Sequence, residues 1–121
     1  MKVKSYKDLI IWQKAKDLVK DIYATTRKFP ESERYILIDQ MHRSANSIPS
    51  NIAEGQSRQY SKEFIQFLYV ALGSSAELDT QLCISKDLGY ITEEELNIFD
   101  CKIVEIRKMI RSIIAKLDTT H

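Results

Sequence analysis

The sequence predicts an all-α protein, an antiparallel up-down-up-down four-helix bundle formed by one domain, residues 1–121. Apolar residues recur at spacings of three and four through four segments of similar length, which is the period of an amphipathic helix. The chain has only 3 Gly and 2 Pro, too few for the turns of a β-sandwich. Short connections between the segments place consecutive helices side by side in opposite directions.

The first helix is predicted over residues 5–28. Ser5 and Asp8 have the spacing of a capping box at its start. Pro30 ends the helix, because a proline disfavours helical backbone at the preceding Phe29. The side chains expected on its inner face are Leu9, Trp12, Ala15, Val19, Ile22 and Thr26.

The second helix is predicted over residues 31–55. Glu31 and Glu33 are expected at its positive N-terminal end, and Gly55 as the left-handed residue that follows its C-terminus. Pro49 lies inside the segment, where a proline removes a hydrogen bond and costs about 3 kcal/mol. We expect a kinked helix, because the apolar period continues across Pro49; the alternative is two shorter helices.

The third helix is predicted over residues 61–88 and the fourth over residues 92–118. Ser61 is expected to cap the third helix. Gly89 is expected to end it, with Tyr90 available for the hydrophobic contact of a Schellman-type cap. Thr92 and Glu95 are predicted to form the capping box of the fourth helix.

Small and polar residues form a regular stripe beside the apolar face of the second helix. The stripe consists of Gln40, Ser44, Ser47, Asn51 and Glu54. It indicates close packing against a partner, either inside the fold or in an oligomer. In an antiparallel hairpin, Arg43 falls opposite Glu77, and we predict a partly buried bidentate pair; the alternative is two solvated charges. The residues assigned to this polar pair or interface are Arg43, Asn51, Glu54 and Glu77.

The sequence contains no constellation that supports catalysis. A di-iron bundle needs two carboxylate-x-x-His pairs, and Asp39 with His42 makes only one. Cys83 and Cys101 have no His within reach by helix register, and no Gly-rich turn could form an oxyanion hole or hold a phosphate. We therefore predict a protein that is not an enzyme, with no metal or cofactor and with His42 at a boundary or on the surface.

Composition favours a protein of the cytoplasm with no membrane contact. The chain is 44% apolar and 29% charged, which is ordinary for a soluble domain. No apolar run reaches the roughly 20 residues that span a bilayer, and the first residues lack the apolar core of a signal peptide. Two cysteines fit a reducing compartment.

Positive residues gather where the first and third helices start and the second and fourth end, which an up-down bundle brings to one end. Lysines at helix starts oppose the helix dipole, so contact with phosphate is one explanation. A solubilising surface is the alternative. The candidate residues for binding RNA or DNA, including lysines along the first helix, are Lys4, Lys7, Lys14, Lys16, Lys20, Arg58, Lys62, Arg111 and Lys116.

Several short motifs, spread over nearly the whole chain, carry a family resemblance. They are Leu9-x-x-Trp12-x-x-Ala15, Ile22-Tyr23, Phe29-Pro30, Gln40-x-x-Arg43-x-Ala45-x-Ser47-Ile48, Asn51-Ile52-Ala53-Glu54-Gly55, Phe67-Leu68, Gly73-Ser74-x-x-Glu77-Leu78 and Leu88-Gly89-Tyr90-Ile91. The chain resembles the four-helix-bundle proteins encoded in intervening sequences of bacterial large-subunit rRNA genes, and more distantly the accessory protein of diversity-generating retroelements. The resemblance implies a homopentamer, no known catalytic activity and a suspected role with nucleic acid.

The chain departs from the family pattern by losing positive charge. The family commonly has two Arg before the Ala, where this chain has His42-Arg43-Ser44-Ala45, and Gly-Arg with another base where it has Gln56-Ser57-Arg58-Gln59. We predict an oligomeric module that binds RNA or DNA through its basic end; the alternative is a scaffold for protein partners only. The residues expected to lie off the core and to support a pentamer are Ile10, Tyr69, Gly73, Ser74, Val104 and Ile114.

Overall fold

A computed structural model describes residues 5–118 of the chain. Its helices, in order, are the 3-10 helix η1 (Tyr6–Asp8), α1 (Ile10–Thr26), the 3-10 helix η2 (Glu31–Glu33), α2 (Leu37–Gln56), α3 (Ser61–Asp87) and α4 (Glu93–Asp118). The described range contains no strand.

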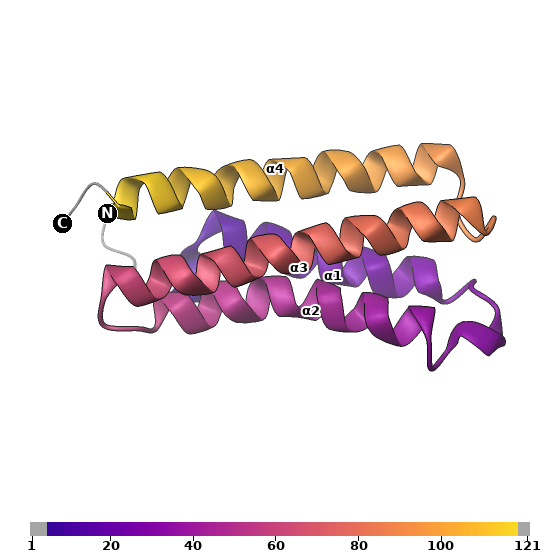
Figure 1. Ribbon diagram of the computed structural model, residues 1–121, viewed down its shortest axis with the longest axis horizontal. Coiled ribbons are helices and arrows are strands. Elements are labelled where there is room, and N and C mark those ends of the chain that lie inside the picture. Colours follow the sequence, from indigo (N-terminus) through magenta and orange to yellow (C-terminus); the bar gives the residue numbers. More distant parts are fainter. Residues whose placement is uncertain (1–4, 119–121) are drawn as a thin grey trace.

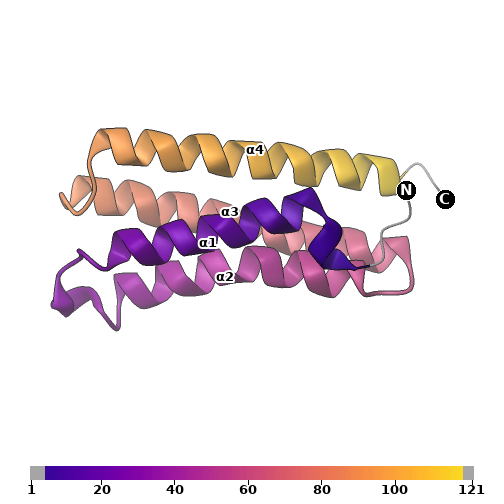
Figure 2. The ribbon, with the colours of Figure 1, turned by 180° about the vertical axis from the view of Figure 1, so that it is seen from behind.

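The four long helices lie side by side, and each runs opposite to the next along the chain (Figures 1 and 2). Helix α1 contacts α2 and α4, and α3 contacts the same two helices. The contact between α2 and α3 is the most extensive, and that between α1 and α4 is the smallest of the four. The predicted all-α bundle is therefore confirmed.

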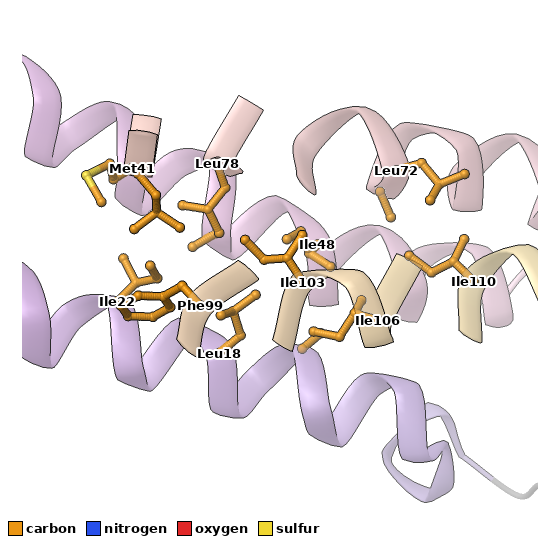
Figure 3. Close-up of a cluster of buried hydrophobic side chains, with 14 of the residues drawn as sticks. Leu18, Ile22, Met41, Ile48, Leu72, Leu78, Phe99, Ile103, Ile106 and Ile110 are labelled. Carbon is orange, nitrogen blue, oxygen red and sulfur yellow. The ribbon is translucent and has the colours of Figure 1, made fainter. Parts of the chain in front are cut away.

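The core is formed by apolar side chains that all four helices turn inward (Figure 3). The buried side chains that the figure labels are Leu18, Ile22, Met41, Ile48, Leu72, Leu78, Phe99, Ile103, Ile106 and Ile110. Burying each of them stabilises the fold by about 1.5–3 kcal/mol. On α1 the buried face differs from the prediction, since Ile11 and Leu18 are buried while Trp12 is only half-buried. Ile114, which was expected to lie off the core, is buried as well.

The predicted starts of the first two helices are wrong. The Ser5 hydroxyl accepts a hydrogen bond from the Lys7 amide at 3.2 Å, but it caps η1, and α1 begins only after the extended backbone of Leu9. Glu31 and Glu33 lie in η2, not in α2. The Tyr90 hydroxyl donates to the Glu33 carboxylate at 2.8 Å, so this segment is held against the α3–α4 connection. The segment predicted as the first turn of α2 is therefore a separate 3-10 helix, which is held by the Tyr90–Glu33 hydrogen bond.

The structure decides two points about α2. The helix runs through Pro49 as one element, as expected, which excludes the alternative of two shorter helices. The prediction for Gly55 is wrong. Gly55 lies inside the helix, is buried and does not adopt the left-handed backbone of a C-terminal cap. A Cβ on Gly55 would lie 2.8 Å from Phe67 Cβ and 2.8 Å from Phe64 Cδ1. Close packing against α3, not the helix end, therefore requires glycine at this position.

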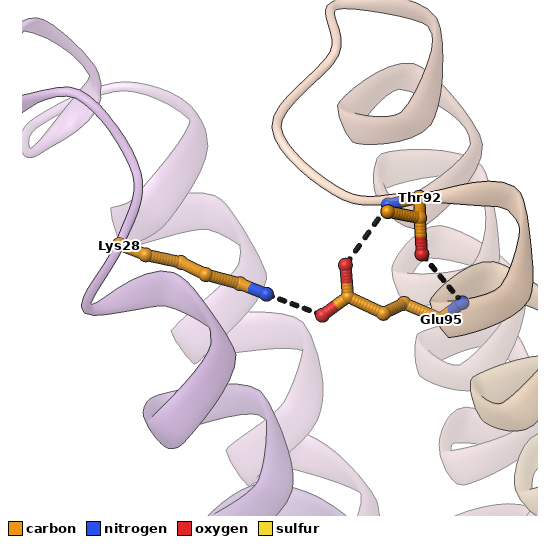
Figure 4. Close-up of polar contacts among 3 residues, drawn as sticks. All are labelled: Lys28, Thr92 and Glu95. Atoms are coloured by element: carbon orange, nitrogen blue, oxygen red, sulfur yellow. Dashed lines mark hydrogen bonds and ion pairs between the residues drawn. The ribbon is translucent and has the colours of Figure 1, made fainter.

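The predicted signals between α3 and α4 are confirmed. Gly89 has φ 81°. Its amide donates to the Lys86 carbonyl at 3.0 Å, and the Tyr90 amide donates to the Ser85 carbonyl at 2.8 Å, which is the Schellman pattern. At the start of α4, the Thr92 amide donates to the Glu95 carboxylate at 2.9 Å, and the Glu95 amide donates to the Thr92 hydroxyl at 3.0 Å (Figure 4).

Candidate functional site

The polar stripe of α2 faces α3 and is largely accounted for within the fold. The hydroxyls of Ser47 and Ser74 share a hydrogen bond of 2.7 Å across the two helices. The Asn51 side-chain amide donates to the Ser47 carbonyl at 2.7 Å and to its hydroxyl at 2.9 Å. Ser44 is buried. Ser74 is buried too, which corrects the expectation that it lies off the core. Small side chains here allow α2 and α3 to approach closely.

The predicted Arg43–Glu77 pair is not formed. The Arg43 Nε donates to Asp39 Oδ2 at 3.1 Å, and the Arg43 side chain is 80% exposed. Glu77 is exposed and has no ion pair within residues 5–118. Glu54 likewise uses a neighbour on its own side of the hairpin, since its carboxylate accepts from Arg58 at 3.0 Å. A carboxylate four residues away along a helix can be reached without bridging the space between helices.

Arg43 and Glu77 nevertheless share a surface, which we call the α2–α3 groove. It encloses about 460 Å³ and is lined by Gln40, Arg43, Ser44, Ser47, Ser74, Glu77 and Gln81. Gln81 Oε1 is buried there and accepts no hydrogen bond from the described part of the chain. The helical register predicted from the sequence therefore brings positions 43 and 77 to one groove, although their side chains do not pair.

The candidate cations of the basic end lie where η1, the α2–α3 connection, the start of α3 and the last turns of α4 meet (Figure 1). They are Lys7, Arg58, Lys62, Arg111 and Lys116, and all are exposed. Lys4 lies outside the described residues. Arg58 is neutralised locally, since it bonds Glu54 at 3.0 Å and lies 4.0 Å from Glu63. Its guanidinium is therefore less available than the side chains of Lys7, Lys62 and Arg111.

The lysines of α1 differ in their surroundings. Lys14 pairs with Glu105 of α4 at 3.3 Å, and Lys16 lies over the Trp12 ring at 5.6 Å from its centre. Lys20 forms no ion pair within the described range. Lys14 and Lys20 line a groove of about 490 Å³ between α1 and α4, which also holds the 2.6 Å ion pair of Lys102 with Asp21. Acidic side chains thus share this groove with the bases.

The opposite end of the bundle is fastened by Glu95 (Figure 4). Its carboxylate accepts from Lys28 of the α1–α2 connection and from the Thr92 amide. The hydrogen bond from Lys28 is the main reason, and that from the Thr92 amide the second, why the pKa of Glu95 lies below its ordinary value of 4.5. One carboxylate therefore both caps α4 and ties it to the end of α1.

Two polar contacts had no counterpart in the sequence prediction. Arg107 Nη1 donates to the Leu72 carbonyl at 2.9 Å and to the Ser75 hydroxyl at 2.5 Å, joining α4 to α3. The His42 ring stacks on Tyr23 at 3.8 Å, and its Nε2 lies 2.9 Å from the Thr26 hydroxyl. Burial lowers the pKa of His42 from 6.5, so the imidazole is neutral at pH 7. The apolar periodicity of a sequence does not show which polar side chain will form a hydrogen bond to a neighbouring helix, so neither contact could be predicted from it.

Two further kinds of feature are absent from residues 5–118. No group of three or more His, Cys, Asp or Glu side chains there lies together in a way that could hold a metal ion. Among the same residues, no helix combines the length and apolar character needed to cross a membrane. Cys83 and Cys101 are free thiols, and both are exposed.

Comparison with known families decides the relationship of the chain. The model of the 23S rRNA-intervening sequence protein family matches residues 7–112. The chain belongs to this family. The stretch contains all of the motifs that carry the resemblance, which is thereby confirmed. No curated protein matches the chain.

A solved structure supports the fold of this family member. It is the crystal structure of a protein of unknown function from the S23 ribosomal protein family of Bacteroides thetaiotaomicron. The two chains are 27% identical, the match covers 87% of this chain and 98% of that one, and the TM-score is 0.80. The match covers most of the bundle, so the two chains share the four-helix fold.

Proposed function

We propose that this family member is a non-enzymatic, oligomeric binding protein of the cytoplasm that contacts RNA or DNA through its basic end and the exposed lysines of α1. A set of exposed cations without an acidic partner in residues 5–118 carries the proposal. They are Lys7, Lys16, Lys20, Lys62 and Arg111. An exposed ion pair contributes little to folding stability, so a lysine or arginine without an acidic partner costs the fold little. Such a side chain remains available to bind a phosphate group.

The salt dependence of binding tests the contact with nucleic acid. Affinity for a mixed-sequence RNA and for single-stranded DNA is measured between about 50 and 200 mM salt, where counterion release gives a steep fall. Lys16→Gln, Lys20→Gln and Lys62→Gln together should reduce the salt slope by about one for each phosphate that the variant no longer neutralises. The matched control removes three charges from the other end of the bundle, with Arg27→Gln, Arg34→Gln and Lys86→Gln.

Absence of binding at about 50 mM salt would exclude the nucleic-acid role. It would favour the second candidate, a scaffold for protein partners. An equal decrease of the slope in the control variant would reduce the contact to general charge attraction.

The solvent face of α3 supports the oligomeric part of the proposal. From residue 66 to residue 84, the exposed positions hold a single charged side chain, Glu77. These positions are Gln66, Tyr69, Val70, Gly73, Ala76, Glu77, Thr80, Cys83 and Ile84. So little charge is typical of a helix that is covered on every side. Ile10 and Val104, 61% and 40% exposed, add apolar surface elsewhere.

We propose a homopentamer, in line with the resemblance. Light scattering at micromolar concentration should then give five times the single-chain mass of 14.1 kDa. A mass of 14.1 kDa would contradict it, and the face of α3 would then have to meet a different protein.

A further inference from the structure

The seam between α1 and α4, the first and last helices of the bundle, is joined differently from the other three seams. It is the smallest of the four helix contacts, and no connection links its two helices directly. Among residues 5–118, every ion pair between distant parts of the chain crosses this seam. These pairs are Lys14 with Glu105 at 3.3 Å, Asp21 with Lys102 at 2.6 Å, and Lys28 with Glu95. The remaining ion pairs of that range join residues at most five positions apart.

The other three seams are joined by hydrogen bonds in which at least one partner is uncharged. The Asn46 side-chain amide of α2 donates to the Tyr23 hydroxyl of α1 at 2.9 Å, and the hydroxyls of Ser47 and Ser74 join α2 to α3 at 2.7 Å. The donor that joins α4 to α3 is Arg107, and its acceptors there are a carbonyl and a hydroxyl oxygen. No ion pair of residues 5–118 joins any of these three pairs of helices.

Salt should therefore act on one seam of the four. Salt screens exposed charges, with a screening length of about 10 Å at about 0.1 M and about 3 Å at about 1 M, whereas a hydrogen bond with an uncharged partner is affected much less. The side chains that form the three ion pairs of the α1–α4 seam are between 30% and 55% exposed. Their attraction is thus open to screening, and a rise in salt concentration weakens this seam more than the others.

The signs of these charges alternate along the seam. Lys14, Asp21 and Lys28 follow one another at intervals of seven residues, which is about two turns of a helix. They meet an acid, a base and an acid of α4. A sliding motion that moved each side chain to the next partner would bring like charges together, and like charges repel. This set of three pairs, which we call the ion-pair ladder, therefore fixes the register of α4 on α1 as well as closing the seam.

Apolar side chains lie beneath the ion-pair ladder. The groove of about 490 Å³ between α1 and α4 is lined by Leu18 and Ile106 as well as by charged residues. Both apolar side chains are buried. On the other side of the bundle, α2 and α3 have the most extensive contact of all. The parts of a protein with the fewest packing contacts open at the lowest free energy, so α1 and α4 should separate while α2 and α3 stay together.

We propose that the seam between α1 and α4 is a salt-sensitive latch. The ion-pair ladder holds it closed at low ionic strength, and screening of the ladder opens it and uncovers Leu18 and Ile106. A rise in ionic strength is thereby converted into exposed apolar surface on one side of the bundle. The latch does not depend on the proposed binding of RNA or DNA, because that proposal rests on cations without an acidic partner.

The reactivity of a buried thiol measures the opening. In the full-length protein the exposed Cys83 and Cys101 are replaced by serine, and Leu18→Cys is added as the reporter. Dithiodipyridine is the thiol reagent, because it is uncharged and salt does not change its approach. The labelling rate should rise at least about threefold between about 20 and about 500 mM sodium chloride. Ser85→Cys, buried between α3 and Met41 of α2, is the matched control and should not show this rise.

Charge reversal tests the ion-pair ladder itself. Lys102→Glu places a second acid opposite Asp21, so it should raise the labelling rate of Leu18→Cys at low salt towards its rate at high salt. Adding Asp21→Lys restores the pair with its signs exchanged and should return the rate to that of the reporter protein. Lys108→Glu changes an exposed lysine of the same helix that lies outside the groove, and it should leave the rate unchanged.

Three results would overturn the proposal. Salt may leave the rate of Leu18→Cys unchanged, or it may raise the rate of Ser85→Cys equally, which would indicate unfolding of the whole bundle. The third is a failure of Asp21→Lys to reverse the effect of Lys102→Glu. Far-ultraviolet circular dichroism checks that each variant is folded, and Ile106→Cys gives the same measurement from α4 if Leu18→Cys does not fold.

Discussion

Gly55 of α2 and Phe67 of α3 approach so closely that a Cβ on Gly55 would lie 2.8 Å from Phe67 Cβ. Further along the same pair of helices, the hydroxyls of Ser47 and Ser74 are 2.7 Å apart. The small residues of the family motifs thus act together to bring α2 and α3 into the most extensive contact of the bundle.

Alanine at position 55 should therefore destabilise the protein. The added methyl group would meet Phe67 Cβ, which cannot move unless the backbone of α3 moves too. Overpacking of this kind costs about 1–3 kcal/mol. Gly73 is the matched control on α3 when unfolding is measured on the monomeric chain, because a Cβ there meets nothing within 4 Å in one chain. Gly73→Ala should gain about 0.5–1 kcal/mol from the higher helix propensity of alanine. Urea unfolding measures both changes, and a Gly55→Ala variant as stable as the wild type would disprove the close contact.

Arg107 should contribute to stability through its hydrogen bonds to α3. Its guanidinium donates to the Leu72 carbonyl and the Ser75 hydroxyl on the neighbouring helix. Arg107→Met keeps much of the apolar stem but removes both hydrogen bonds between α3 and α4, which should cost about 1–3 kcal/mol. The Leu72 carbonyl still accepts from the Ser75 hydroxyl at 2.6 Å. The same change at exposed Arg111 should stay within about 0.5 kcal/mol. Equal destabilisation at both positions in chemical denaturation would argue against the bond between α3 and α4.

The sequence predicted those features that depend on residues close together in the chain. Gly89 with its Schellman cap and Thr92 with Glu95 are decided by contacts within five residues, so their spacing alone identifies them. The four-helix pattern follows likewise from local apolar periodicity. Local competition also explains the failure for Arg43, because Asp39 on its own helix is closer than Glu77 across the groove.

The features that the sequence did not predict depend on contacts between distant residues. The end of α1 and the start of α2 are set by the Phe29 and Tyr90 rings, 5.2 Å apart, and by the bond from Tyr90 to Glu33. A glycine near the end of a helical period predicts a helix end, but Gly55 is required by its packing against Phe64 and Phe67 of another helix, which the period does not show. A helical period reports which face is buried, and it carries no information on which partner a polar side chain will find.

His42 should make stability depend on pH near neutrality. Burial lowers its pKa from the ordinary 6.5, so the unfolded chain binds a proton more readily than the folded one. Its contribution is fully present above pH 6.5 and is lost as the pH falls through the lower pKa of the folded state. Urea unfolding should show a stability difference between wild type and His42→Gln that decreases from about pH 7.5 to about pH 5. A difference independent of pH would show that the stacked imidazole titrates normally.

Asp79 makes the free energy of unfolding change with pH in the opposite direction to His42. The comparison of wild type with His42→Gln removes this contribution. Burial is the main reason that its pKa is raised from 3.8, and the nearby Asp100 adds to this effect. Its folded state therefore binds a proton more readily than the unfolded chain. Both proteins in the comparison retain Asp79, so its contribution cancels.

Glu95 should hold the start of α4 against the end of α1, and this stabilising contact should be lost in acid. Its pKa lies below 4.5 because the folded state bonds the carboxylate to Lys28 and to the Thr92 amide. The resulting stability is present above pH 4.5 and is lost as the pH falls through the lowered value, where the folded carboxylate takes up its proton. Lys28→Met should therefore destabilise the protein at pH 7, and its difference from the wild type should shrink as the pH falls below about 4. Lys86, at the same end, has no ion pair within residues 5–118, so Lys86→Met should show no pH-dependent difference. A resonance titration that places the Glu95 pKa at or above 4.5, or a Lys28→Met difference that persists to about pH 3, would contradict the link.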